Sequence, residues 1–143
     1  MGLFAILAGL ASVNLLRPQT QASLDGTVQT IIADVKSQQL KAMSGDSEGQ
    51  AAAQQYGVHF ETSSYTLFQS SSYVPGDPAN FVVNADNLQL TTTFPSAQVV
   101  FARRSGDITG FVAGSTGITI LNTQSGQQKT ITLNRFGVID SIN

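Results

Sequence analysis

The spacing of apolar residues divides the chain into two parts with different periodicities. Residues 1–16 carry no charge and have no polar face, and from residue 24 apolar residues recur at steps of three and four. Such steps place side chains on one face of an α-helix. After residue 55 apolar and polar residues alternate in short runs, which is typical of β-strands. The pattern therefore predicts an α+β fold, in which an N-terminal helix precedes an antiparallel sheet.

The predicted helix covers residues 1–43 and consists of two stretches. Residues 1–17 are apolar nearly all round, whereas residues 18–43 are amphipathic, and we expect Pro18 to bend the helix rather than to end it. Polar residues of the second stretch, Gln38 among them, are expected on its outer faces. Its apolar face is expected to pack on the sheet through Leu24, Val28, Ile31, Ile32 and Val35, with Ala42 and Met43 following at the end.

The uncharged run at the front does not fit the usual classes of apolar segment. It has sixteen residues, whereas a membrane-spanning helix needs about 20. It lacks the basic start and the cleavage pattern of a secretory signal. As a core helix of a soluble domain it would leave a large apolar surface exposed. None of these three classes therefore accounts for the run, and the front of so long a helix is expected to protrude from the rest of the chain.

Residues 44–143 are expected to form a globular β head domain. A polar, glycine-containing linker over residues 44–55 precedes the first alternating run. Turns rich in Gly, Pro, Ser and Asn separate the later runs, and a loop with two prolines occupies residues 70–80. This order predicts an antiparallel sheet of about six or seven strands, and its clearest hairpin lies near the C-terminus.

The amino-acid composition excludes several classes of function but says little about the fold. The 143 residues include seven Lys and Arg against nine Asp and Glu, a formal net charge of −2, so nucleic-acid binding is not expected. There is no Cys, which excludes disulfides and thiolate chemistry. His59 is the only histidine and is expected on the polar face of a strand, where no particular serine is singled out as its partner. We therefore expect neither enzymatic activity nor a cofactor.

Two further groups of charged residues have alternative interpretations. Asp46, Glu48 and Asp77 lie in turns and offer oxygen ligands for Ca²⁺, but their spacing matches no EF-hand loop, and we favour solvated turns. Arg103 and Arg104 are adjacent in a predicted turn, where they would contact either a phosphate or a partner protein. A solvated turn is again the interpretation that we favour, and no metal site is expected.

Four stretches of the sequence, taken in order, resemble those of a known family. They are GLFAILAGLASVNLLRP, TVQTIIADVKSQQLKAM, YGVHFETSSYTLF, and the C-terminal series VVFARRSGDITG, GITILNT and KTITLNRFGVI. Together they resemble type IV pilin-like proteins and are most similar to the GspH/FimT family. Members of that family are minor pseudopilins of type II secretion and type IV pilus systems.

The resemblance implies a pilin fold, in which a long N-terminal helix packs on an antiparallel sheet. It also implies a structural subunit that is anchored in the inner membrane by a single span, with the head domain outside the cytoplasm. The subunit then joins a pilus or pseudopilus, and its partners are other pilin subunits bound through the N-terminal helix. The resemblance further implies that residues 1–17 pack first in the membrane and then in the fibre core, through Leu3, Phe4, Ile6, Leu7, Leu10, Val13, Leu15 and Leu16. The alternative is a DNA-binding minor pilin that acts in DNA uptake.

The resemblance is incomplete at both ends of the chain. The family carries a leader and an early glutamate, but no Glu precedes Glu48 here, so neither the processing site nor the docking glutamate can be placed on any residue. We expect the front of the helix to be missing, and a chain without it to fold but not to be processed or assembled normally. The C-terminal RFGVIDSIN has one Arg, which disfavours the DNA-binding alternative.

Overall fold

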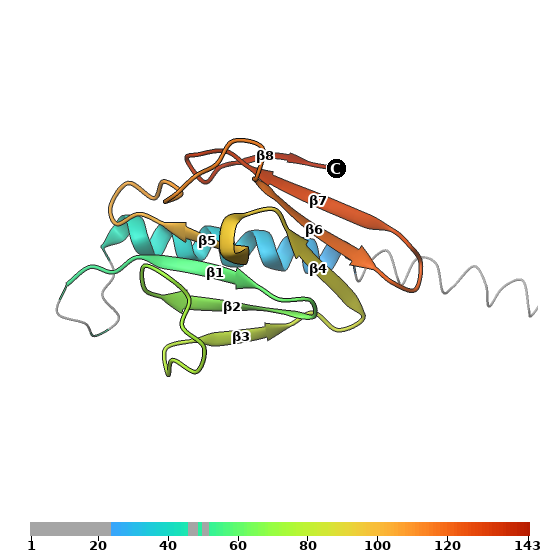
Figure 1. Cartoon of the computed structure of the whole chain (residues 1–143), viewed down its shortest axis with the longest axis horizontal. Helices are drawn as coiled ribbons and strands as arrows, with labels where there is room; N and C mark the ends of the chain where they lie inside the picture. Colours follow the sequence, from blue (N-terminus) through green and yellow to red (C-terminus); the bar gives the residue numbers. More distant parts are fainter. Residues whose placement is uncertain (1–23, 46–48, 50–51) are drawn as a thin grey trace, which may run out of the picture.

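The architecture is α+β, as the sequence predicts. A computed structural model describes residues 24–45, 49 and 52–143 (Figure 1). Within these ranges one helix and eight strands are present, and every strand pairing is antiparallel. The strands are β1 (Tyr56–Phe60), β2 (Ser64–Gln69), β3 (Phe81–Asn84), β4 (Leu88–Thr92), β5 (Gln98–Phe101), β6 (Gly117–Asn122), β7 (Gln128–Leu133) and β8 (Ile139–Ile142), and a short 3-10 turn, η1 (Pro95–Ala97), precedes β5.

The prediction of one sheet with six or seven strands is wrong, because the strands form two four-stranded sheets. The first has the order β3-β2-β1-β5 and the second the order β4-β6-β7-β8. The chain passes between the two sheets three times, and the first crossing, from β3 to β4, is a tight turn in which Asn87 has a φ of 64°. Alternation of side chains predicts where strands occur, but it does not specify which strands pair.

The helix covers residues 24–44 of the described chain and runs along both sheets (Figure 1). Its five predicted packing residues are each at most 8% exposed and join one core with side chains from β1, β4, β5, β6 and β7. These residues are Leu24, Val28, Ile31, Ile32 and Val35. The two sheets thus share a single apolar core, which the helix closes on one side.

Two residues of the helix lie differently from the prediction. Gln38 was expected on an outer face but is only 3% exposed, because it continues the buried series of Ile31, Val35 and Ala42 at helical spacing. Met43 was expected on the apolar face but is 45% exposed. It follows Ala42 by one residue, which turns it about 100° away from the centre of that face.

The predicted membrane or fibre-core stretch lies outside the described residues. This applies to all of its packing side chains, from Leu3 to Leu16, and to the junction at Pro18. Asp46 and Glu48, considered above as calcium ligands, also fall outside the described ranges.

Candidate functional site

Polar contacts on the buried side of the helix join it to the first sheet. Gln38 Nε2 donates to the carbonyl oxygens of Gly57 and Phe68, at 2.9 and 3.1 Å, and all of these groups are buried. Tyr65 Oη donates to Asp34 Oδ2 at 2.6 Å. Burial and the neighbouring Asp34 carboxylate both raise the pKa of Tyr65 well above its usual value, so the hydroxyl stays protonated. The contacts orient the helix on the sheet rather than forming a reactive site.

Replacement of Gln38 by leucine is expected to destabilise the fold by about 1 kcal/mol, because two buried carbonyl groups lose a donor. The urea midpoint measures this change. Gln29, which is exposed on the same helix, supplies the matched control, and Gln29→Leu should move the midpoint by much less. Equal midpoints for Gln38→Leu and the unaltered chain would contradict a stabilising role for this amide.

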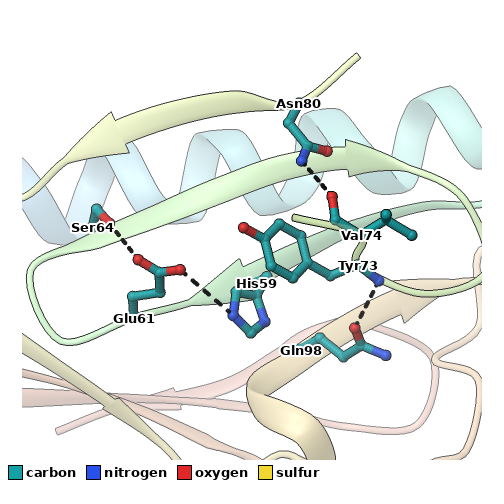
Figure 2. Close-up of polar contacts among 7 residues, drawn as sticks. All are labelled: His59, Glu61, Ser64, Tyr73, Val74, Asn80 and Gln98. Carbon is teal, nitrogen blue, oxygen red and sulfur yellow. Dashed lines mark hydrogen bonds and ion pairs between the residues drawn. The ribbon is translucent and has the colours of Figure 1, made fainter. Parts of the chain in front are cut away.

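A second cluster lies on the opposite face of the first sheet, around His59 (Figure 2). The imidazole ring stacks on the ring of Tyr73, with 4.0 Å between centroids and 5° between planes. Tyr73 comes from the loop between β2 and β3, and its backbone N–H donates to Gln98 Oε1 at 3.0 Å. Phe68 meets Tyr73 edge-on at 5.9 Å. The stack therefore holds the 70–80 loop against the sheet.

The polar groups beside His59 have the wrong order for a catalytic triad. His59 Nε2 lies 4.0 Å from Glu61 Oε1, and Ser64 Oγ donates to Glu61 Oε2 at 3.4 Å (Figure 2). In a hydrolytic triad the imidazole stands between the hydroxyl and the carboxylate, so that it can take the serine proton. Here the carboxylate stands between the other two groups. This arrangement cannot activate Ser64 through His59.

His59 is expected to make the stability of the fold fall at mildly acidic pH. Burial lowers the pKa of its imidazole, while the Glu61 carboxylate and the Ser96 backbone oppose that shift more weakly. The side chain is 18% exposed, and Nδ1 is buried without a hydrogen-bond partner among the described residues. The folded state therefore favours the neutral ring, and a proton binds the unfolded chain more readily.

Above pH 6.5, the ordinary pKa of histidine, the ring is neutral in both states and the free energy of unfolding is expected to be at its full value. It should decrease as the pH falls from there through the lower pKa of the folded state. Thermal melting between pH 5 and pH 7.5 measures this loss. Because the chain has one histidine, His59→Gln should remove the part of the pH dependence that lies near pH 6. An unchanged profile in that variant would assign the effect to carboxylates instead.

The other charged candidates take part in local structure. Asp77 accepts a hydrogen bond from the backbone of Ala79 at 2.9 Å and so closes its own turn. Arg103 Nη1 donates to the carbonyl of Ala53 at 3.2 Å. Arg104 has a φ of 72°, and its backbone N–H donates to the Ala42 carbonyl near the end of the helix at 2.9 Å. The two arginines thus lie at the contact between the β5–β6 loop and the segments beside it.

Exposed apolar side chains gather at two places. A groove of about 270 Å³ lies between the helix and the turn before β8, and its lining includes Leu40 and Val138. These two side chains are 63% and 56% exposed. The second place is β3, where Phe81 and Val82 are 65% and 57% exposed. Helical and strand periodicity in the sequence did not single out either surface.

The comparisons with known proteins give no relative. No family model, no curated protein and no solved structure matches the chain. Within the described residues, no group of three or more His, Asp or Glu side chains is arranged to hold a metal ion. None of the helical sequence in those same ranges has both the length and the apolar character needed for a membrane crossing.

Proposed function

We propose that the chain is a structural subunit, a pilin or minor pseudopilin, of a type IV pilus-like filament or of a type II secretion pseudopilus. In this proposal the fold is a pilin fold, and residues 1–17 anchor the subunit in the inner membrane before assembly. The head domain then lies outside the cytoplasm. In the filament the same apolar segment packs against other subunits, so that the function requires binding surfaces and no reacting group.

One observation supports the proposal above the others. The uncharged sequence of residues 1–16 precedes, along the chain, a helix that is described from residue 24 and whose apolar face is buried against antiparallel sheets. This order combines a folded head with an apolar segment at one end. The clusters around His59 and Gln38 are explained by packing and by loop attachment, which agrees with a structural role.

Membrane attachment is the first test, performed on the full chain in bacterial membranes. The unaltered chain should stay with the membranes during alkaline extraction, whereas Leu7→Asp combined with Leu10→Asp should be released. Each carboxylate near the centre of a membrane helix costs about 3 kcal/mol. Gln29→Asp, which adds a charge on an exposed face, is the matched control and should stay with the membranes. Release of the unaltered chain would contradict the proposal.

Packing between N-terminal segments is the second test. Because the chain has no native cysteine, Val13→Cys introduces a single thiol into the apolar run. Oxidation in membranes should give disulfide-linked dimers through this position. A monomeric Val13→Cys chain that remains in the membrane would support an anchor without the proposed fibre-core contact.

The distribution of Lys and Arg gives little support to the DNA-binding alternative. The six Lys and Arg of the described ranges are distributed over the helix, the β5–β6 loop, β7 and the following turn. Lys129 is paired with Asp25 at 3.1 Å. A DNA-binding surface requires a clustered basic stripe. A mobility shift of duplex DNA at low salt and micromolar protein would favour the alternative, and we expect none.

A further inference from the structure

Strand β3 forms an open edge of the first sheet. Its neighbour is β2, to which Phe81–Asn84 pair in a regular antiparallel register from Leu67 back to Ser64. In Figure 1 it is the outermost strand of that sheet, and no described element lies beside its outer edge. Phe81 and Val82 are more than half exposed. The strand is thus accessible to another extended chain.

The register determines which backbone groups point outward. Ala85 N–H donates to the Ser63 carbonyl at 2.9 Å, so the backbone of Ala85 faces β2. Since the groups alternate along a strand, Val83 also faces β2, opposite Tyr65. The N–H and C=O groups of Val82 and Asn84 therefore point away from the sheet, where a further strand would bond to them.

The other edges of the two sheets are engaged or irregular. The edge of β5 is occupied where Thr109 N–H donates to the Val100 carbonyl at 2.8 Å. On β4, Leu90 N–H donates to the Thr62 carbonyl at 2.8 Å. The pairing of β7 with β8 contains an irregularity at Thr132 and Leu133, and β8 carries Asp140.

Irregular or charged strands discourage pairing between sheet edges. The sequence of β3, Phe-Val-Val-Asn, contains no charge, no proline and no bulge. Among the four edges of the described sheets, β3 is the one that is suited to accept a strand.

We infer that β3 pairs with β3 of a second copy of this chain, antiparallel and about a two-fold axis through Val83. In this register Val82 lies opposite Asn84 of the second copy. By symmetry, Asn84 lies opposite Val82 of the second copy. The two pairs use all the outward N–H and C=O groups of these residues, because each forms a doubly bonded pair. Val83 then lies opposite its own equivalent.

The composition of the strand favours a second copy over an unrelated segment. Self-pairing brings together two uncharged strands, so no like charges meet at the contact. Each copy presents the same two outward residues, Val82 and Asn84. A two-fold axis places Val82 of each copy opposite Asn84 of the other, as a self-complementary contact requires. The exposed Phe81 and Val82 side chains lose apolar surface on pairing. The β3 edge can therefore act as both sides of the contact.

The expected association is weak in dilute solution. A four-residue strand pair buries less than the roughly 1,200 Å² of a stable interface. Where two copies are already held close together, the second contact gains from a high effective concentration. Covalent trapping is therefore a better measurement than molecular size. The inference does not depend on the proposed filament function, since it concerns only the head domain.

The experiment uses Val83→Cys in the full chain, which has no other cysteine. Directly opposed residues between doubly bonded pairs have Cα atoms about 4.5 Å apart, within the range that a disulfide accepts. Mild oxidation in detergent solution should give a dimer on a non-reducing gel. Thr91→Cys on β4 and Val138→Cys beside the groove are the controls, and both positions are exposed. Their cross-linked fraction should be lower by about tenfold.

Two second-site changes in the Val83→Cys chain test the backbone bonds. Val82→Pro removes an outward N–H that β2 does not use, and cross-linking should be lost while the melting temperature stays near that of Val83→Cys. If the proline variant does not fold, Val82→Lys provides the same test by adding a charge to the edge.

A folded Val83→Cys chain that stays monomeric overturns the inference. It is also overturned by equal cross-linking at all three cysteine positions, by cross-links that survive folded Val82→Pro or Val82→Lys, or by a disulfide to a different protein in place of the dimer. The result for Val13→Cys is independent of these outcomes, so failure of the filament proposal and failure of the β3 contact are distinguishable.

Discussion

Replacement of Gly57 by alanine is expected to destabilise the protein by about 3 kcal/mol. A Cβ at this position would lie 2.5 Å from Cζ of Phe68 and 2.6 Å from the carbonyl oxygen of Val99. The Phe68 ring is 2% exposed and is held edge-on by Tyr73, so it has little room to move. The Val99 oxygen belongs to the paired strand β5 and cannot move without disturbing the sheet.

Gly26→Ala is the matched control for this prediction. Gly26 is exposed in the helix, and an added Cβ meets no atom within 4 Å. Alanine is favoured over glycine in a helix by about 0.8 kcal/mol, so this variant should be slightly more stable than the unaltered chain. Urea unfolding of both variants measures the two changes, which should have opposite signs. A Gly57→Ala protein of unaltered stability would contradict the close approach of Phe68 to the β1 backbone.

Replacement of Ile31 by alanine is expected to destabilise the protein by about 3 to 4 kcal/mol. Ile31 is 0% exposed and lies in the core where the helix meets the sheets. Truncation removes apolar contacts and leaves a cavity that the surrounding strands cannot readily fill, because hydrogen bonds within the two sheets hold their backbones in place. Chemical denaturation gives the change in the free energy of unfolding.

Leu40→Ala provides the comparison on the same helix. Leu40 is 63% exposed and loses little buried surface, so its truncation should change the free energy of unfolding by less than about 0.5 kcal/mol. Similar losses for Ile31→Ala and Leu40→Ala would mean that the helix does not present the Ile31 face to the core. That result would undermine the packing arrangement on which the fold and the proposed function rest.

Local periodicity was enough to determine the type of the helix and of most strands, but not the 3-10 turn at Pro95–Ala97. Steps of three and four from Leu24 to Val35 place those side chains on one helix face in any tertiary context. Alternation in YGVHF, and in GITILN as far as Ile120, likewise places residues on the two faces of a strand, and both stretches are strands in the structure. The absence of cysteine decided in advance that no disulfide holds the fold. These properties depend on neighbours within a few residues.

Pairings between distant residues were decided only by the tertiary structure. The division into two sheets depends on β4 pairing with β6, far along the chain, rather than with β3. The burial of Gln38 depends on two strand carbonyls that its amide reaches. The β3 edge differs from the β4 and β5 edges because other segments of the chain hydrogen-bond to those two. The sequence shows which positions are polar. Which group a polar side chain or backbone group bonds to is decided only when the helix and strands pack together.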